Sequence, residues 1–343
     1  MSDHTPFVAA VPSPRSVSSR AGIRRAALLV AGACALLTGL ATPADAYVRY
    51  KTKDGKNTYA WTTSFEPILC YPSGLTSDAG AMLTADQIGD AATQAASAWT
   101  RRDPTLSACT YLDVPVIVDA AAASPTRPIA KYDKKNLLVF RSDNWCSSDT
   151  DCYDPSALAI TSVWARESTG EIVDADIEVN AVNFVWADLV SMPSLGGGRQ
   201  DLQNALTHEM GHFIGLDHTC WSDPRVAQPT DYQGQPVPEC ATASDEVKAT
   251  TMFASADAGD TSKRTLAPDD QLAVCDIYPL AADPMRDPPG WVETCPDGGA
   301  PCTPKMVAGG GGGCAVAGDP KRGAALMGLA LLFVAAAIGK RRR

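Results

Sequence analysis

Histidine is scarce in this chain of 343 residues, which has only four. His4 lies in an N-terminal segment that we expect to be removed, so three histidines are left for the mature chain. A second metal site built on histidines is therefore excluded. The scarcity also gives weight to the one short stretch in which the other three gather.

Negative charge outweighs positive charge in the body of the chain. Residues 1–46 and 319–343 hold ten Lys and Arg and three Asp and Glu, a net charge of +7, whereas the whole chain carries −10. The stretch between them therefore has a net charge of −17. Nucleic acids and anionic membrane surfaces bind basic surfaces, so this acidity argues against both as partners.

The cysteines lack the C-x₂-C spacing of a cysteine-based zinc site. Nine of them lie between residues 47 and 302, and in an exported protein they predict disulfides. Pairs favoured by closeness in sequence are Cys146 with Cys152, Cys220 with Cys240, and Cys295 with Cys302. Because nine is odd, at least one cysteine stays free or pairs with Cys314 or another chain.

The N-terminus has the pattern of an export signal. Four arginines between residues 15 and 25 precede an apolar run from Ala26 to Leu40, and Ala44-Asp45-Ala46 offers a small-x-small cleavage site. We therefore expect residues 1–46 to be a signal peptide and Tyr47 to begin the mature chain. The alternative is a lipoprotein signal at Cys34, which lacks the usual preceding leucine.

The C-terminus carries a second apolar segment. The linker over residues 284–318 ends in the glycine run Gly309–Gly313, which we expect to be a flexible tether. Residues 319–343 hold an apolar run of about the minimum length for a membrane span, followed by four basic residues. The positive-inside rule puts that basic end in the cytoplasm. The sequence thus predicts a protein at the cell surface or secreted, held at a membrane at least initially.

The stretch from His208 to His218 has the form H-E-x-x-H-x-x-G-x-x-H. On a helix, His208 and His212 share a face because they lie four residues apart. Gly215 can end the helix with a positive φ and return the chain, which brings His218 in as a third nitrogen ligand. Three ligands leave the fourth position of a tetrahedral zinc to water, and Glu209 is placed to take that water's proton. Solvated histidines on a helix are the alternative.

This long motif resembles the signature of the metzincin zinc metallopeptidases. Thr250 to Ala254, with Met252 at its centre, resembles the methionine turn of that family, although an ordinary buried methionine is the alternative. Further similarities point to the matrixin branch and its bacterial members. They are Gly211, Thr219, the stretch Gly170 to Ile177, and Leu266 to Gln271 before Ile277-Tyr278.

The resemblance implies an α+β fold for residues 47–283, with a twisted, mostly parallel sheet, an active-site helix and a smaller C-terminal subdomain. It also implies structural Ca²⁺, although no EF-hand loop or other fixed calcium spacing is present and we assign no residue to it. Neither a cysteine-switch propeptide nor the histidines of a second, structural zinc are found. The C-terminal tail resembles the sorting tails of myxobacterial surface proteins, which are processed near a cysteine; a plain membrane anchor is the alternative.

Local patterns predict the secondary structure. Helices are expected over residues 84–101, from 202 onward with Asp201 as its cap, and over 268–278. Strands are expected over residues 58–62, 114–118, 136–140, 159–166 and 172–179. Residues 191–198 are expected to form a loop. The carboxylates available for calcium are Asp143, Asp149, Asp151, Asp154, Asp174, Asp176 and Glu178.

The favoured function is that of an exported zinc endopeptidase acting on a protein or peptide. His208, His212 and His218 hold one Zn²⁺, and Glu209 is the general base. One alternative is a catalytically silent surface protein of the same fold that serves in binding or adhesion; the presence of Glu209 and the lack of adhesion repeats argue against it. Zinc-dependent hydrolysis of a bond other than a peptide is a third possibility.

Overall fold

The computed structural model describes residues 47–76, 83–123, 131–147, 152–195, 198–223 and 227–285, and the backbone of residues 309–316. The expected signal peptide, the C-terminal apolar run and the pair Cys295 and Cys302 lie outside these ranges. Among the residues described, no helix has both the length and the apolar character needed to cross a bilayer.

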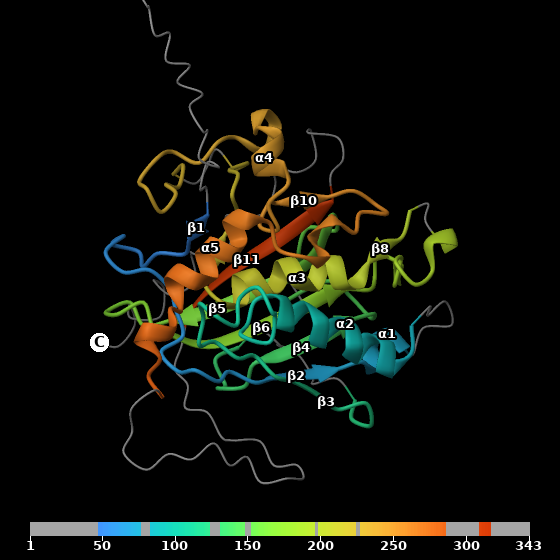
Figure 1. Ribbon diagram of the computed structural model, residues 1–343. Helices are drawn as coiled ribbons and strands as arrows, with labels where there is room; N and C mark the ends of the chain where they lie inside the picture. The colour runs from blue at the N-terminus through green and yellow to red at the C-terminus, as the bar shows by residue number, and fades with distance from the viewer. Residues whose placement is uncertain are drawn as a thin grey trace, which may run out of the picture. The chain divides into compact units, whose positions relative to one another are not determined.

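The protein has a mixed α+β fold built on a seven-stranded sheet, in which five adjacent strands form a mostly parallel part (Figure 1). These five strands, in their order across the sheet, are β3 (Val116–Val118), β2 (Ile68–Tyr71), β4 (Leu137–Arg141), β6 (Ile172–Asn180) and β5 (Ala157–Ala165). The first four are parallel, and β5 runs antiparallel to β6. The predicted α+β class is confirmed, and four of the five predicted strands fall on β3, β4, β5 and β6.

The prediction of a strand over residues 58–62 is wrong. Thr58 and Ala60 make only isolated bridges, whereas the first strand of the large sheet, β2, was not predicted. The aromatic residues that suggested a strand are buried for another reason. The indole of Trp61 donates to the carbonyl of Phe213 at 2.9 Å, so this segment packs against the end of a helix instead of pairing along the sheet.

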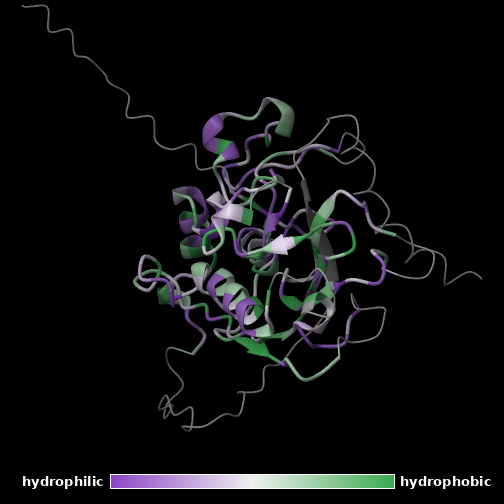
Figure 2. Cartoon of the chain, turned by 90° about the vertical axis from the view of Figure 1, so that its right-hand side faces the viewer, coloured by the Kyte–Doolittle hydropathy of each residue, from purple (hydrophilic) through white to green (hydrophobic). Residues whose placement is uncertain are grey.

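Two helices pack together on one face of the sheet, where they enclose the largest hydrophobic core (Figure 1). They are α2 (Ala85–Ala98) and α3 (Leu202–Phe213). A capping box between Thr84 and Gln87 begins α2 near the predicted position. The indole of Trp99, just after α2, donates to Thr207 in α3 at 2.7 Å and ties the two helices together. Helices in Figure 2 carry both hydrophilic and hydrophobic residues, as expected for a helix such as α2, which has one buried face.

Short elements make up the rest of the described chain. The N-terminal β1 (Val48–Arg49) pairs with β9 (Leu216–Asp217), and β7 (Trp186–Ala187) pairs with β8 (Gln200–Asp201). The short helices are α1 (Ser73–Thr76), η1 (Pro193–Leu195), η2 (Cys240–Thr242), α4 (Asp245–Lys248), η3 (Ser262–Arg264) and η4 (Leu280–Ala282). Helix α5 (Pro268–Ile277) starts at Pro268 as predicted.

The glycine run that we expected to be a flexible tether belongs to a strand. Strand β11 (Gly309–Val316) pairs antiparallel with β5, with Gly312 opposite Thr161, and β10 (Ser255–Ala256) pairs with the end of β11. Strands β11 and β10 thereby cover the outer edge of β5 and extend the sheet to seven strands. Glycine allows another backbone to approach closely, because it has no side chain to accommodate.

Three disulfides join cysteines of the described chain. The predicted pairs Cys146–Cys152 and Cys220–Cys240 are both present. The third, Cys109–Cys275, links positions 166 residues apart and could not be predicted from closeness in sequence. Cys70 is the free cysteine among the described residues, and burial raises the pKa of its thiol to about 12. A buried, protonated thiol of this kind is unreactive.

Candidate metal centre

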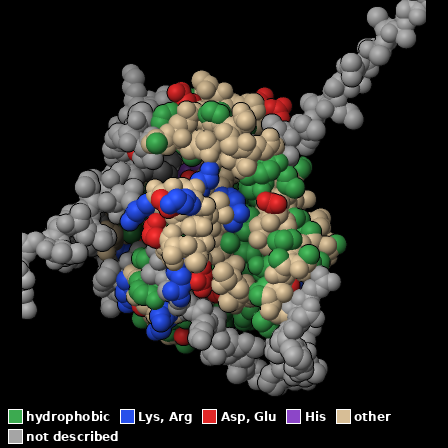
Figure 3. Space-filling model, turned by 90° about the vertical axis from the view of Figure 1, so that its left-hand side faces the viewer, with side chains coloured by type: hydrophobic (Ala, Val, Ile, Leu, Met, Phe, Trp, Pro, Cys, Tyr) green, Lys and Arg blue, Asp and Glu red, His purple; other side chains and the backbone are tan. Residues whose placement is uncertain are grey.

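Helix α3 carries the first two histidines of the motif. Asp201 caps the helix, as predicted, by accepting from the backbone of Asn204 at 2.9 Å. Every residue of α3 is buried, so the helix is enclosed on all sides. His208 and His212 therefore lie one turn apart in the protein interior, and almost no histidine surface is visible on the face drawn in Figure 3.

Gly215 turns the chain back after the helix. It has a φ of +99°, a conformation that side chains disfavour, and a Cβ at this position would meet the carbonyl oxygen of Tyr59 at 2.5 Å. Both observations require glycine. The returning chain forms β9 and delivers His218 opposite the helix, as the motif predicted.

The three imidazoles converge on one point. Nε2 of His218 lies 3.2 Å from Nε2 of His208 and 3.1 Å from Nε2 of His212. Nitrogens bound to a tetrahedral zinc at about 2.0–2.1 Å are about 3.3–3.4 Å apart, so the observed spacing fits a shared ion closely. The described chain contains this one group of three potential ligands that could hold a metal.

Backbone carbonyls fix which nitrogen of each helical imidazole faces the centre. Nδ1 of His208 lies 2.6 Å from the carbonyl of Thr251, and Nδ1 of His212 lies 2.8 Å from that of Leu216. Each Nδ1 carries the proton and donates it, which leaves the Nε2 lone pair for a metal. The hydroxyl of Tyr50, a residue that the motif did not point to, lies 3.1 Å from Nδ1 of His212.

The environment keeps the imidazoles neutral. Burial lowers the pKa of His208 and of His218 well below the ordinary value, and the positive charge of Lys263 adds to the effect. Burial also lowers the pKa of His212, to about 4. Neutral imidazole is the form that binds a metal, so the site is ready for a cation at neutral pH.

Glu209 follows His208 and is fully buried. Its Oε2 accepts a hydrogen bond of 2.6 Å from the hydroxyl of Thr161 in β5. The predicted base thus directly follows the first histidine of the group in α3, and its carboxylate is hydrogen-bonded to the sheet. Thr161 was not predicted, because a threonine within a strand belongs to no recognised motif.

Met252 packs directly against helix α3, which carries His208 and His212. A Cβ on Gly211, between the two helical histidines, would meet Sδ of Met252 at 2.1 Å and Trp99 at 2.9 Å. The Met252 segment also holds the site from below, since Thr251 accepts from His208. Lys263, which sequence reasoning missed, is buried and donates through Nζ to the carbonyl of Phe253.

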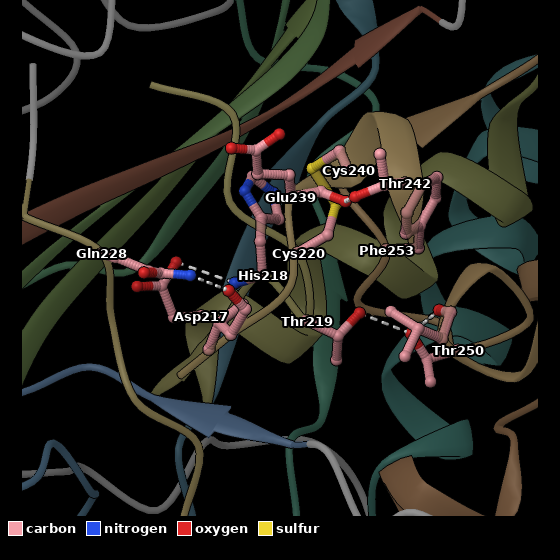
Figure 4. Close-up of a disulfide and its surroundings, with 12 residues drawn as sticks. Asp217, His218, Thr219, Cys220, Gln228, Glu239, Cys240, Thr242, Thr250 and Phe253 are labelled. Carbon is pink, nitrogen blue, oxygen red and sulfur yellow. Dashed lines mark hydrogen bonds between the residues drawn. A yellow bond between two sulfur atoms is a disulfide. The ribbon is translucent and has the colours of Figure 1, made fainter. Parts of the chain in front are cut away.

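A disulfide closes the loop that follows His218 (Figure 4). Cys220, two residues after the ligand, is joined to Cys240. Thr219 donates its amide to Met252 at 3.1 Å, and its hydroxyl lies 2.7 Å from that of Thr250. The third ligand is thereby connected to the Met252 segment on one side and to the disulfide on the other.

The carboxylates considered for calcium come together only in part. Asp174 and Asp176 are both buried on β6, whereas Glu178 forms an ion pair with Arg141 at 2.8 Å. Asp143 is exposed, Asp154 bonds to Ser156, and residues 149 and 151 lie outside the described ranges. The loop before β4 adds two backbone donors to Asp174, from Asp133 at 2.8 Å and Lys134 at 2.7 Å.

A scan against protein-family models finds no match to this chain, and a search of curated proteins finds none either.

Proposed function

We propose that this chain is an exported zinc endopeptidase of the metzincin type, similar to the matrixins. The observation that carries the proposal is the convergence of three neutral imidazoles beside a buried glutamate. That combination is the one expected of a catalytic zinc site, because a purely structural site uses four protein ligands and has no need of a base.

The donor set fits zinc. Three imidazole nitrogens of fixed tautomer suit this borderline ion, and the described ligand group lacks the set of oxygens that calcium or magnesium prefers. When bound, Zn²⁺ would supply Lewis acidity to polarise a carbonyl and to lower the pKa of water toward about 7. His208, His212 and His218 would hold it.

Glu209 would perform the proton transfers. Its carboxylate adjoins the ligand set and would take a proton from the attacking water, then give it to the departing amine. The attacking group is water, so no covalent enzyme intermediate is expected. Met252 would support the helix from beneath without touching the metal.

Two further observations support the family assignment and the export. Gly211 lies against Met252, which is the contact expected if the Met252 segment acts as a methionine turn. Three disulfides in the described chain suit an oxidising compartment outside the cytoplasm. The membrane-held tail stays a prediction.

Cleavage of a peptide library tests the proposal. The full-length chain, produced in a host that exports it and forms disulfides, is compared with Glu209→Ala and with Glu246→Ala, a matched control at an exposed glutamate of helix α4. Zinc content is measured on all three. We expect one zinc in each protein, cleavage by the parent and the control, and a loss of at least about 100-fold in Glu209→Ala.

Two outcomes would contradict the proposal in different ways. Zinc in all three proteins without cleavage by any would favour the catalytically silent binding protein. Cleavage by Glu209→Ala at the parental rate would remove the role of this carboxylate.

A further inference from the structure

Thr161 is a polar residue in an apolar position. It lies in the middle of β5 and is fully buried, and the residues two positions away on the same side, Ala159 and Val163, belong to the hydrophobic core. Valine has the same shape and would bury no hydroxyl. Burying a hydroxyl lowers the stability of the fold unless the hydroxyl is hydrogen-bonded. The hydrogen-bond partner of Thr161 therefore indicates what its hydroxyl does.

That partner is Glu209. The hydroxyl oxygen of Thr161 lies 2.6 Å from Oε2 of Glu209 and 3.2 Å from the backbone carbonyl of the same residue. A hydroxyl has one proton to donate, and a charged carboxylate is a stronger acceptor than a backbone carbonyl. The hydrogen bond to Oε2 is therefore the stronger of the two. The bond connects strand and helix across 48 positions of the sequence.

A glutamate side chain has several rotatable bonds, whereas a general base acts only within hydrogen-bond reach of the proton that it takes. Fixing one carboxylate oxygen on β5 restricts Glu209 to one position relative to the neighbouring ligand His208. We infer that Thr161 is a positioning residue for Glu209. The inference rests on the proposed peptidase activity, and Thr161 acts through Glu209 without touching the substrate.

Two substitutions separate positioning from packing. Thr161→Val keeps the shape and removes the hydroxyl, whereas Thr161→Ser keeps the hydroxyl and removes the methyl group. If Thr161 positions Glu209, valine lowers kcat about 10- to 100-fold with KM unchanged, and serine stays near the parental value. If Thr161 only fills space, valine is silent and serine is the harmful change.

The experiment measures kcat and KM on a peptide that the parent cleaves, together with zinc content and thermal midpoint, for the full-length chain and each variant. Ser162→Ala is the matched control, because its side chain points to the opposite face of β5. We expect one zinc and nearly parental thermal midpoints in every protein, with the loss confined to kcat of Thr161→Val.

The outcomes are distinct. No cleavage by the zinc-loaded parent refutes the proposed function and, with it, the positioning role of Thr161. A parental kcat in Thr161→Val, or a loss that is equal in the valine and serine variants, refutes the role of Thr161 alone. If valine abolishes folding or zinc binding, Thr161→Ala is compared with Thr161→Ser: activity in serine alone supports positioning, and equal activity overturns it.

Discussion

The backbone nitrogen of Tyr47 lies 3.1 Å from Oδ1 of Asp269 in helix α5, and both residues are buried. The next carboxylate, Asp270, accepts from the backbone of Thr251 at 2.8 Å. Two adjacent side chains of α5 thus connect the first described residue with the Met252 segment that packs against α3. Tyr47 is also the residue at which the signal pattern predicts the mature chain to begin.

Cleavage after Ala46 would turn that nitrogen into an ammonium and the hydrogen bond into an ion pair. We therefore expect Asp269→Asn to lower the free energy of unfolding by about 1.5–3 kcal/mol, the range for hydrogen bonds to charged groups. Denaturant unfolding measures the change, and N-terminal sequencing verifies Tyr47 as the first residue. Asp257→Asn, at an exposed carboxylate, is the control. Equal stability of Asp269→Asn and the parent would contradict the pairing.

Removal of zinc is expected to abolish cleavage and to lower the thermal midpoint. A ligand present at about 100 times its Kd stabilises the folded state by about 2.7 kcal/mol, and this contribution disappears with the metal. A chelator selective for zinc over calcium is added, followed by Zn²⁺ to restore both properties. His218→Ala, which lacks one ligand, should show no shift with the chelator; a shift as large as that of the parent would place the metal elsewhere.

The candidate metal centre could be predicted because the residues that form it lie close together in the sequence. Helical spacing puts His208 and His212 on one face, and Gly215 returns the chain within six residues. The contacts of Thr161 could not be predicted in the same way. They depend on the antiparallel pairing of β5 with β6 and on the packing of α3 against β5, and each of these brings together distant parts of the chain.

The fold was predictable where apolar patterns were long and regular. Strands β5 and β6, with nine residues each, were predicted nearly to their ends. The aromatic residues around Trp61 led to the wrong prediction of a strand, because burial against a helix and burial in a sheet favour the same residue types. Strand β2 has only four residues, too few for a clear alternation of polar and apolar positions.

Gly211→Ala is expected to disrupt the site although alanine favours helices. The added methyl group would overlap Sδ of Met252 and approach Trp99, so the helix or the Met252 segment must shift. We expect a loss of about 1–3 kcal/mol of stability and weaker zinc binding. Combining it with Met252→Ala removes the sulfur and should restore part of the zinc affinity. Parental zinc affinity in the single variant would show that the contact is unimportant.

The buried carboxylates of β6 predict an unusual dependence of stability on pH. Burial raises the pKa of Asp176 to about 9 and that of Asp174 to about 6, and the charge of Asp174 adds to the shift of Asp176. In the unfolded chain both titrate near 4. The folded protein therefore binds more protons above pH 4, so its stability falls as pH rises toward 9, with a slope of at most about 1.4 kcal/mol per pH unit for each proton.

Asp176→Asn should reduce this slope, because the amide stays neutral at every pH while its oxygen still accepts from the backbone of Leu137, as the carboxylate does at 3.0 Å. Unfolding free energies between pH 5 and 9 in calcium-free buffer measure the effect. Calcium, which the family resemblance implies, gives the opposite expectation: an ion held by these carboxylates would stabilise the parent at pH 8 and leave Asp176→Asn unaffected. If the unfolding free energies of parent and variant depend equally on pH, Asp176 is ionised in the folded protein without loss of stability.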